Sequence, residues 1–427
     1  MQHKIVSLAK ATALVPNNKA DNDERVDAKV SEPKAIEKLR MSFLCLLTFA
    51  VAIPSNQTIN LVGELYLTEL LLPMLAIGVL FFGKTVAFRE KIIWYFVLLA
   101  VCLMMGYIVS DLVAGTDSSK YLRAWGRNFI LFVDFVSLAI IMASDRRLLW
   151  WYALGFSTGT LITLVLGRVP IEEWKFGYAQ PITILVLLSA YFVSFRVAAL
   201  LLVFLAVISI YMDSRSASAF ALFVAGVIFL RIKRPEGIKL SLSALIRIIV
   251  LGGLLLTLLL VLMNKTYEEY SDRREASSSG RIAALRVGGV AIANSPILGY
   301  GSWGEGTGDY ASMYYEDMKK KMAELGRRFT EGDVFRPHSQ ILQSWMEGGF
   351  FAAAFFLFFG YQLVKCLKDV VLVRRLDYLS PLYVFFLLIS VWHLLMSPYG
   401  GGHRLSIALS ISIICLLYAE KSKLNRV

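Results

Sequence analysis

The 427-residue chain carries little charge for its length. Lys, Arg, Asp and Glu together make up 18% of it, whereas 57% of the residues are hydrophobic and the mean hydropathy is +0.61. A typical soluble domain has about a quarter charged residues, and it could not bury an apolar fraction of this size. The composition therefore excludes an ordinary soluble enzyme and indicates a polytopic membrane protein.

Motifs for nucleotide, hydrolase and metal chemistry are also missing. The sequence has no Walker A motif, no Gly-x-Ser-x-Gly and no His-Glu-x-x-His. His393 and His403 have no ligand-like spacing with the other histidines, so we predict no metal and no cofactor. No nucleic-acid motif accompanies the net charge of +12, which instead fits cytoplasmic loops that orient the chain. The cysteines show no Cys-x-x-Cys spacing and are predicted to be small buried side chains: Cys45, Cys102, Cys366 and Cys415.

Long apolar runs fill the chain instead. A spanning helix needs about 20 mostly apolar residues, which predicts an all-α membrane protein with about twelve transmembrane helices. Residues 1–40 have no apolar run near Met1, so we expect a loosely ordered cytoplasmic tail and no cleaved signal peptide. The approximate spans are 41–60, 65–82, 92–110, 129–143, 148–166, 180–194, 197–211, 217–231, 244–263, 338–364, 379–396 and 404–419.

Lys and Arg alternate between these spans as the positive-inside rule requires when the N-terminus is inside. Nine helices then occupy 41–263, three occupy 338–419, and both the 1–40 and 420–427 tails are cytoplasmic. The predicted outer loops include 111–128, which still contains several cations.

A hydrophilic loop of about 74 residues, 264–337, lies on the outer side. Arg281–Asn294 carries an apolar helical stripe, Met313–Arg328 is helix-compatible, and a Gly-rich turn segment lies between them. A loop this long is usually functional or disordered, and its aromatic residues argue against disorder. We predict a partly helical loop whose aromatic residues, Trp303 among them, pack on the membrane surface or stack on sugar rings.

His338 opens the helix after this loop and is the main candidate for chemistry. An imidazole titrates near neutrality, so it can take a proton from a hydroxyl. The positive end of the helix dipole lowers its pKa and favours the neutral, basic form. The structural alternative is an interfacial histidine that bonds only water or backbone.

Arginines surround His338 on the predicted outer side. Arg215 lies in a very short turn, where a cation near hydrocarbon usually has a functional partner; the alternative is a guanidinium that reaches for headgroups. Arg281 begins the helical stretch of the long loop. Because Arg binds phosphate through two parallel hydrogen bonds, such a group suits an anionic, lipid-linked substrate. The other cations considered as substrate ligands are Arg123, Arg127, Arg336 and Arg404, with Lys120 beside them.

Two carboxylates, Glu69 and Asp134, fall inside predicted helices. Each either lines a cavity open to the outside or pairs with an arginine, and structural pairing is the favoured reading.

Several motifs occur in one order around the long loop: Ser214–Ala217, Gly280-Arg281, Pro296–Gly301, Pro337–Gln343 and Glu347–Gly349. In this order and placement, over about residues 210–350, they resemble the O-antigen ligase and polymerase superfamily. The sequence departs from the commonest histidine motif by carrying Ser339 where Asn is frequent, and Arg336-Pro337 precedes the histidine.

The resemblance implies a membrane glycosyltransferase of the GT-C type that joins glycans at the periplasmic face of the bacterial inner membrane. The donor would be an undecaprenyl-diphosphate-linked O-antigen, and a ligase would use lipid A-core lipopolysaccharide as acceptor. The reaction would invert the anomeric carbon without a metal. His338 would be the catalytic base, and Arg215 and Arg281 would bind the diphosphate.

Three hypotheses follow, and a ligase is preferred. An O-antigen or exopolysaccharide polymerase of the same superfamily would use a growing lipid-linked glycan as acceptor. A lipid-linked glycan transporter would differ in class, but the two halves show no convincing repeat, and the cations gather at one membrane face instead of the midplane.

Overall fold

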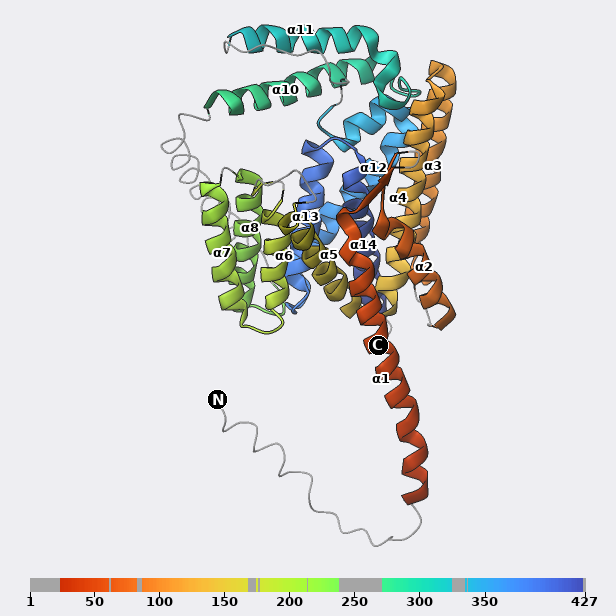
Figure 1. The fold of residues 1–427 in the computed structure, drawn as a ribbon, viewed down its shortest axis with the longest axis vertical. Helices are drawn as coiled ribbons and strands as arrows, with labels where there is room; N and C mark the ends of the chain where they lie inside the picture. Colours follow the sequence, from red (N-terminus) through yellow and green to blue (C-terminus); the bar gives the residue numbers. More distant parts are fainter. Residues whose placement is uncertain are drawn as a thin grey trace. The chain divides into compact units, whose positions relative to one another are not determined.

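The computed structural model describes residues 24–60, 63–82, 87–167, 174–175, 177–212, 214–237, 271–324, 335 and 337–424. These residues contain thirteen α-helices and one two-stranded sheet (Figure 1). The chain divides into two compact units, 1–46 and 47–427. The part of the first unit that is described is the beginning of helix α1, and the contacts discussed below lie in the second unit.

The helices before the long loop are α1 (Glu24–Ala52), α2 (Leu67–Phe82), α3 (Lys91–Ala114), α4 (Ser118–Ser144), α5 (Arg147–Val165), α6 (Ala179–Ser189), α7 (Phe195–Tyr211) and α8 (Arg215–Ile232). Those of the loop and after it are α10 (Ser271–Asn294), α11 (Gly308–Glu324), α12 (Gln340–Leu372), α13 (Ser380–Met396) and α14 (Arg404–Leu424). Short 3-10 turns are η1 (Ile53–Asn56), η2 (Ala87–Arg89), η4 (Ser302–Thr307) and η5 (Gly401–His403).

The helical, membrane-embedded class predicted from composition agrees with these elements. Seven of the described helices are long and apolar enough to cross a membrane, and four more are apolar but shorter. The number of crossings therefore stays a prediction, and the predicted span 244–263 lies outside the described residues.

The first predicted span, 41–60, is wrong at its end, whereas 65–82 agrees with α2 to within two residues. The first helix stops at Ala52, where the η1 turn contains Pro54, a residue that cannot continue a helix. The chain then forms an antiparallel hairpin of β1 (Thr58–Asn60) and β2 (Glu64–Tyr66). This hairpin was not expected, because both strands lie in or beside runs that read as apolar helix.

The predicted outer loop 111–128 is also wrong, since most of it is helix. Gly115 ends α3 in a left-handed conformation with φ of 64°, and Asp117 caps α4 by accepting a hydrogen bond from the Ser119 amide at 2.8 Å. Lys120, Arg123 and Arg127 therefore project from α4. Similarly, α1 begins at Glu24, so the expected loosely ordered tail is wrong from residue 24 onward; Glu, Ala and Lys in this stretch favour helix.

Close helix contacts depend on small residues, as is usual in membrane bundles. Helices α3 and α12 pack together at Gly106, where an added Cβ would lie 2.9 Å from the Ala352 amide nitrogen. Cys45, Cys366 and Cys415 are buried, as predicted, whereas Cys102 is only partly buried.

The long loop contains two helices that pack side by side, α10 and α11 (Figure 1). Both expected helices are confirmed, although α10 begins ten residues and α11 five residues earlier than predicted. The Gly-rich segment between them turns as expected and includes η4.

Candidate active site

His338 lies immediately before α12 and is half-buried between two anchored neighbours. On one side, Ser339 caps the helix by accepting a hydrogen bond from the Leu342 amide at 3.4 Å, and its hydroxyl donates to the Leu394 carbonyl of α13 at 3.1 Å. On the other side, Pro337 is buried against Gly288 of α10, where an added Cβ would lie 3.0 Å from Pro337 Cγ. The backbone around His338 is thus fixed by α10 and α13.

The apolar stripe of α10 explains how the long loop is held over this point. Ala284, Val287 and Ala291 recur at helical spacing on one face, and they form one buried cluster with Phe335 and Met346. The cluster therefore seals α10 against the residues just before His338 and against the first turns of α12.

Two predicted site residues, Arg281 and His338, come close enough to interact electrostatically. Burial and the positive charge of Arg281 both lower the pKa of His338 below its ordinary value. The lowered pKa keeps the imidazole neutral, with a lone pair to accept a proton, at neutral pH.

Arg215 lies at the same end of the helices as His338. It is the first residue of α8 and is exposed, while Ser214 before it is buried. Five residues further on, the Phe220 ring lies 5.9 Å from the Trp392 ring of α13, and Trp392 is two residues from the Leu394 carbonyl that Ser339 binds. Five helical residues rise about 7.5 Å, so Arg215 lies near the level of the Ser339 cap.

Two of the sequence motifs form one structural unit. Helix α12 is interrupted at Gly349, which has φ of 68°. The Pro296–Gly301 segment lies across this break: the Phe350 amide donates to the Ile297 carbonyl at 3.1 Å, and the Tyr300 amide donates to the Met346 carbonyl at 2.8 Å. Any Cβ at Gly349 would collide with the Ile297 carbonyl, so this docking requires glycine.

The same segment is tied to α3. The Gly301 amide donates to the Ser110 hydroxyl at 2.8 Å, and that hydroxyl donates to the Glu347 carbonyl at 2.6 Å. Asp111 accepts hydrogen bonds from the Ser302 amide at 2.5 Å and the Ser302 hydroxyl at 2.7 Å. The Gly-rich segment thereby joins α3 to α12.

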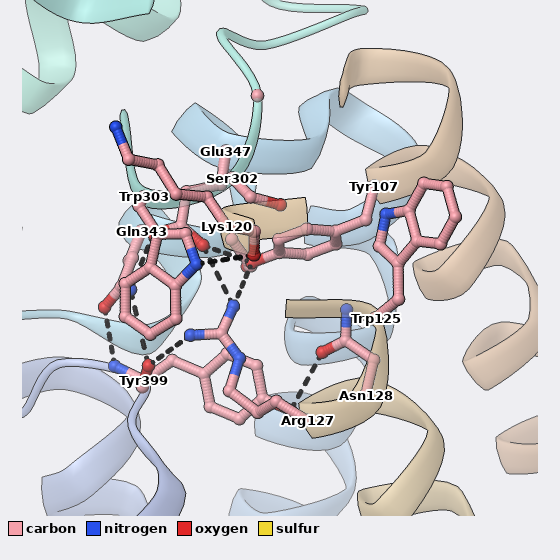
Figure 2. Close-up of polar contacts among 12 residues, drawn as sticks. Tyr107, Lys120, Trp125, Arg127, Asn128, Ser302, Trp303, Gln343, Glu347 and Tyr399 are labelled. Atoms are coloured by element: carbon pink, nitrogen blue, oxygen red, sulfur yellow. Dashed lines mark hydrogen bonds and ion pairs between the residues drawn. The ribbon is translucent and has the colours of Figure 1, made fainter. Parts of the chain in front are cut away.

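A buried ion pair, Arg127 with Glu347, lies beneath this unit (Figure 2). The guanidinium Nη2 is 3.0 Å from Glu347 Oε2, and the side chains are 2% and 0% exposed. Tyr107 donates its hydroxyl to the same carboxylate oxygen at 2.8 Å, while Arg127 Nη1 donates to the Tyr399 carbonyl at 2.7 Å.

Gln343 lies one turn before Glu347 and determines which groups of this network donate hydrogen bonds and which accept them. Its Oε1 accepts a hydrogen bond from the Tyr399 amide at 2.6 Å, and its Nε2 donates to Glu347 Oε1 at 2.8 Å. Rings of Tyr399 and Trp303 also lie 4.2 Å and 5.3 Å from the guanidinium carbon of Arg127. Since the charge of Arg127 is engaged inside the protein, its role as a substrate ligand stays a prediction that this geometry does not favour.

Arg404 has a similar buried environment. It donates to both carboxylate oxygens of Glu69 at 2.7 Å and to the Glu64 carbonyl at 2.6 Å, which confirms structural pairing for Glu69. Asp134 is fully buried, and no ion pair between it and an arginine occurs among the described residues. Substrate binding by Arg404 likewise stays a prediction.

The remaining candidates differ in position. Arg123 is exposed on α4, and Arg336 lies outside the described residues. His393 and His403 pack edge to face with ring centroids 4.8 Å apart. In the part of the chain that the structure describes, no group of three or more His, Cys, Asp or Glu side chains is arranged to hold a metal.

Sequence reasoning missed Glu347 and Gln343 as the centre of a polar network. The rule that singled out Glu69 and Asp134, a carboxylate inside an apolar helix, also applies to Glu347. That rule therefore predicts a buried polar partner for Glu347, as it does for Glu69.

Residues 200–357 match a family model described as O-antigen ligase. The matched segment contains Arg215, Arg281, His338 and the Glu347–Gly349 break, and it confirms the resemblance to the O-antigen ligase and polymerase superfamily. No curated protein matches the chain.

Proposed function

We propose that this protein is an O-antigen ligase. It would transfer O-antigen polysaccharide from undecaprenyl diphosphate to lipid A-core, at the periplasmic face of the bacterial inner membrane. The observation that carries the proposal is the juxtaposition of His338 with Arg281, inside the segment that matches the family model.

His338 would act as the general base. The acceptor hydroxyl loses its proton to the neutral imidazole while its oxygen bonds to the anomeric carbon of the donor. The bond from that carbon to the diphosphate oxygen breaks on the opposite face, which inverts the configuration. The pKa lowered by burial and by Arg281 keeps the base unprotonated before the acceptor arrives.

Arg281 and Arg215 would stabilise the departing diphosphate. Negative charge grows on the bridging oxygen as the bond breaks, and fixed guanidinium groups aimed at that position lower the barrier. Undecaprenyl diphosphate is a good leaving group, so the reaction needs no nucleotide. No metal is required in this scheme, because the two cations neutralise the charge.

The buried network would hold the base in place. Arg127, Glu347 and Gln343 tie α12 to α4 and to the Tyr399 backbone, and α12 begins two residues after His338. Catalytic groups work best when their supporting shell is rigid, so these residues serve as positioning residues.

Purified protein in detergent, undecaprenyl-diphosphate-linked O-antigen and rough lipopolysaccharide provide the test, with and without EDTA. We expect wild type to form a ladder of capped lipopolysaccharide that survives EDTA, and His338→Ala to form none. His403→Ala is the matched control and should retain the ladder. Elongation of the lipid-linked donor in place of capping would assign the protein to the polymerases. In liposomes, movement of a labelled lipid-linked glycan across the bilayer without a new glycosidic bond would refute the proposed enzyme activity.

A further inference from the structure

Trp303 has an unusual backbone. It is the one non-glycine residue with positive φ among the described residues, with φ of 64° and ψ of 12°. A bulky side chain rarely adopts this conformation, because its Cβ is crowded against the backbone there. Strain of this kind persists only where surrounding contacts impose it, and it is concentrated at binding and catalytic sites.

The contacts that impose it also fix the indole ring. Ser302, the preceding residue, is clamped to Asp111 through its amide and its hydroxyl. The indole Nε1 donates to the Lys120 carbonyl at 2.9 Å, and the ring lies 5.3 Å from the Arg127 guanidinium carbon (Figure 2). The polar edge of the indole is thus satisfied by the protein, while the side chain remains partly exposed.

The ring lies along a cationic stripe of α4. Lys120, Arg123 and Arg127 are spaced i, i+3 and i+7, so they share one face of the helix. The Trp303 indole donates a hydrogen bond to the Lys120 carbonyl, and its ring packs on the Arg127 guanidinium. Arg123 lies between them on the same face and is exposed.

We propose that Trp303 and Arg123 form a subsite for one pyranose ring of an anionic glycan. The apolar face of the sugar stacks on the indole, and a carboxylate or phosphate on that sugar pairs with Arg123. A fixed aromatic ring loses little side-chain entropy when it binds, and guanidinium suits such anions through paired hydrogen bonds. This proposal rests on the proposed glycosyl transfer, because either the donor or the acceptor glycan supplies the ring.

Steady-state kinetics with each substrate varied in turn test the subsite. Trp303→Asn removes the ring but tolerates positive φ, Trp303→Phe keeps an aromatic face, and Arg123→Gln removes the charge. Trp345→Phe is the matched control, since Trp345 is also partly exposed and donates its Nε1 to a backbone carbonyl, that of Pro296 at 2.8 Å. Thermal unfolding of each variant checks that it folds.

We expect Trp303→Asn to raise the KM for one substrate roughly tenfold, a loss of about 1.4 kcal/mol, with kcat little changed. Trp303→Phe should raise the same KM less, and Trp345→Phe should leave it unchanged. A rise confined to lipopolysaccharide identifies the acceptor glycan, and a rise confined to the lipid-linked donor identifies the donor.

Unchanged KM values in a folded Trp303→Asn protein would overturn the subsite. So would a fall in kcat alone, which would make Trp303 a cover over the Arg127 ion pair. Retention of rough lipopolysaccharide and of lipid-linked donor on the immobilised proteins gives a readout independent of turnover. If wild type retains either glycan but forms no product, the proposed function fails, and loss of retention in Trp303→Asn still supports the subsite.

Discussion

Glu347→Gln hardly changes the volume of the side chain, but it should lower the free energy of unfolding strongly. Removing one partner of a buried ion pair leaves an uncompensated charge and costs about 3–5 kcal/mol. Water cannot compensate here, because the two side chains are 2% and 0% exposed. The substitution is nearly isosteric, so the loss measures charge and hydrogen bonding instead of packing.

The network leaves the new amide no satisfactory orientation. If the Gln oxygen faces Arg127 and Tyr107, its NH2 group faces the Gln343 Nε2 donor. Turning Gln343 over would remove that clash but would lose its bond from the Tyr399 amide. If instead the NH2 group faces Arg127, two donors meet, and Nη2 of the guanidinium loses the carboxylate oxygen as its acceptor. Each arrangement leaves at least one buried group unpaired.

The midpoint of thermal unfolding, followed by tryptophan fluorescence in one detergent at one scan rate, measures the effect. Glu236→Gln is the matched control, because Glu236 forms an exposed pair with Arg375 at 3.4 Å, and the two side chains are 76% and 78% exposed. Such surface pairs contribute about 0–1 kcal/mol, so the control should unfold close to wild type.

A double-mutant cycle separates the pair from its surroundings. Arg127→Met and Glu347→Met should each lower the midpoint strongly, and the double variant should lose much less than the sum of the two. Additive losses, or a Glu347→Gln protein as stable as the Glu236→Gln control, would refute the reasoning.

Three further predictions concern the site. Gly349→Ala should lower both the unfolding midpoint and activity, because it strains a positive-φ position and collides with the Ile297 carbonyl; circular dichroism melts and the capping assay measure the two losses. Arg281→Gln should raise the pKa of His338, so the acid limb of the kcat/KM profile, below pH 6.5 in wild type, should shift to higher pH. Arg215→Lys should lose activity despite keeping its charge, since a lysine lacks the paired donors of a guanidinium; wild-type turnover would argue against a diphosphate clamp.

The apolar runs predicted the helices well where the need to satisfy backbone hydrogen bonds in lipid alone determines the structure. The runs 92–110, 148–166 and 379–396 became α3, α5 and α13 with small changes at their ends, because a run of this length has no other way to satisfy its backbone in lipid. Hydropathy predicted 111–128 wrongly as a loop, because its charged residues end the apolar runs on either side although the helices continue through them. The caps at Gly115 and Asp117 do mark the true helix ends, and they were available in the sequence.

Pairing between distant residues was harder to predict. Arg127 and Glu347 are 220 positions apart, and neither hydropathy nor spacing connects them. Arg127 therefore read as an outer-loop cation suited to a substrate, although α4 carries it inward to a buried carboxylate. The Glu69 pairing was predicted because a carboxylate inside an apolar helix needs a partner, yet which arginine would supply it could not be read from the chain.

The motifs that carry the resemblance have two physical roles, and neither role separates a ligase from a polymerase. Pro296–Gly301 and Glu347–Gly349 are engaged with each other through backbone bonds and a glycine break, so any chain that seats a long loop on this helix needs them. His338 and Arg281 suit deprotonation and charge neutralisation, which a ligase and a polymerase require equally. Neither set distinguishes the two acceptors, because the base His338 needs only a hydroxyl, which both acceptors supply. Residues that decide between them must lie on surfaces that meet the acceptor glycan, and the partly exposed Trp303 with Arg123 on the α4 stripe is the first place to look for them.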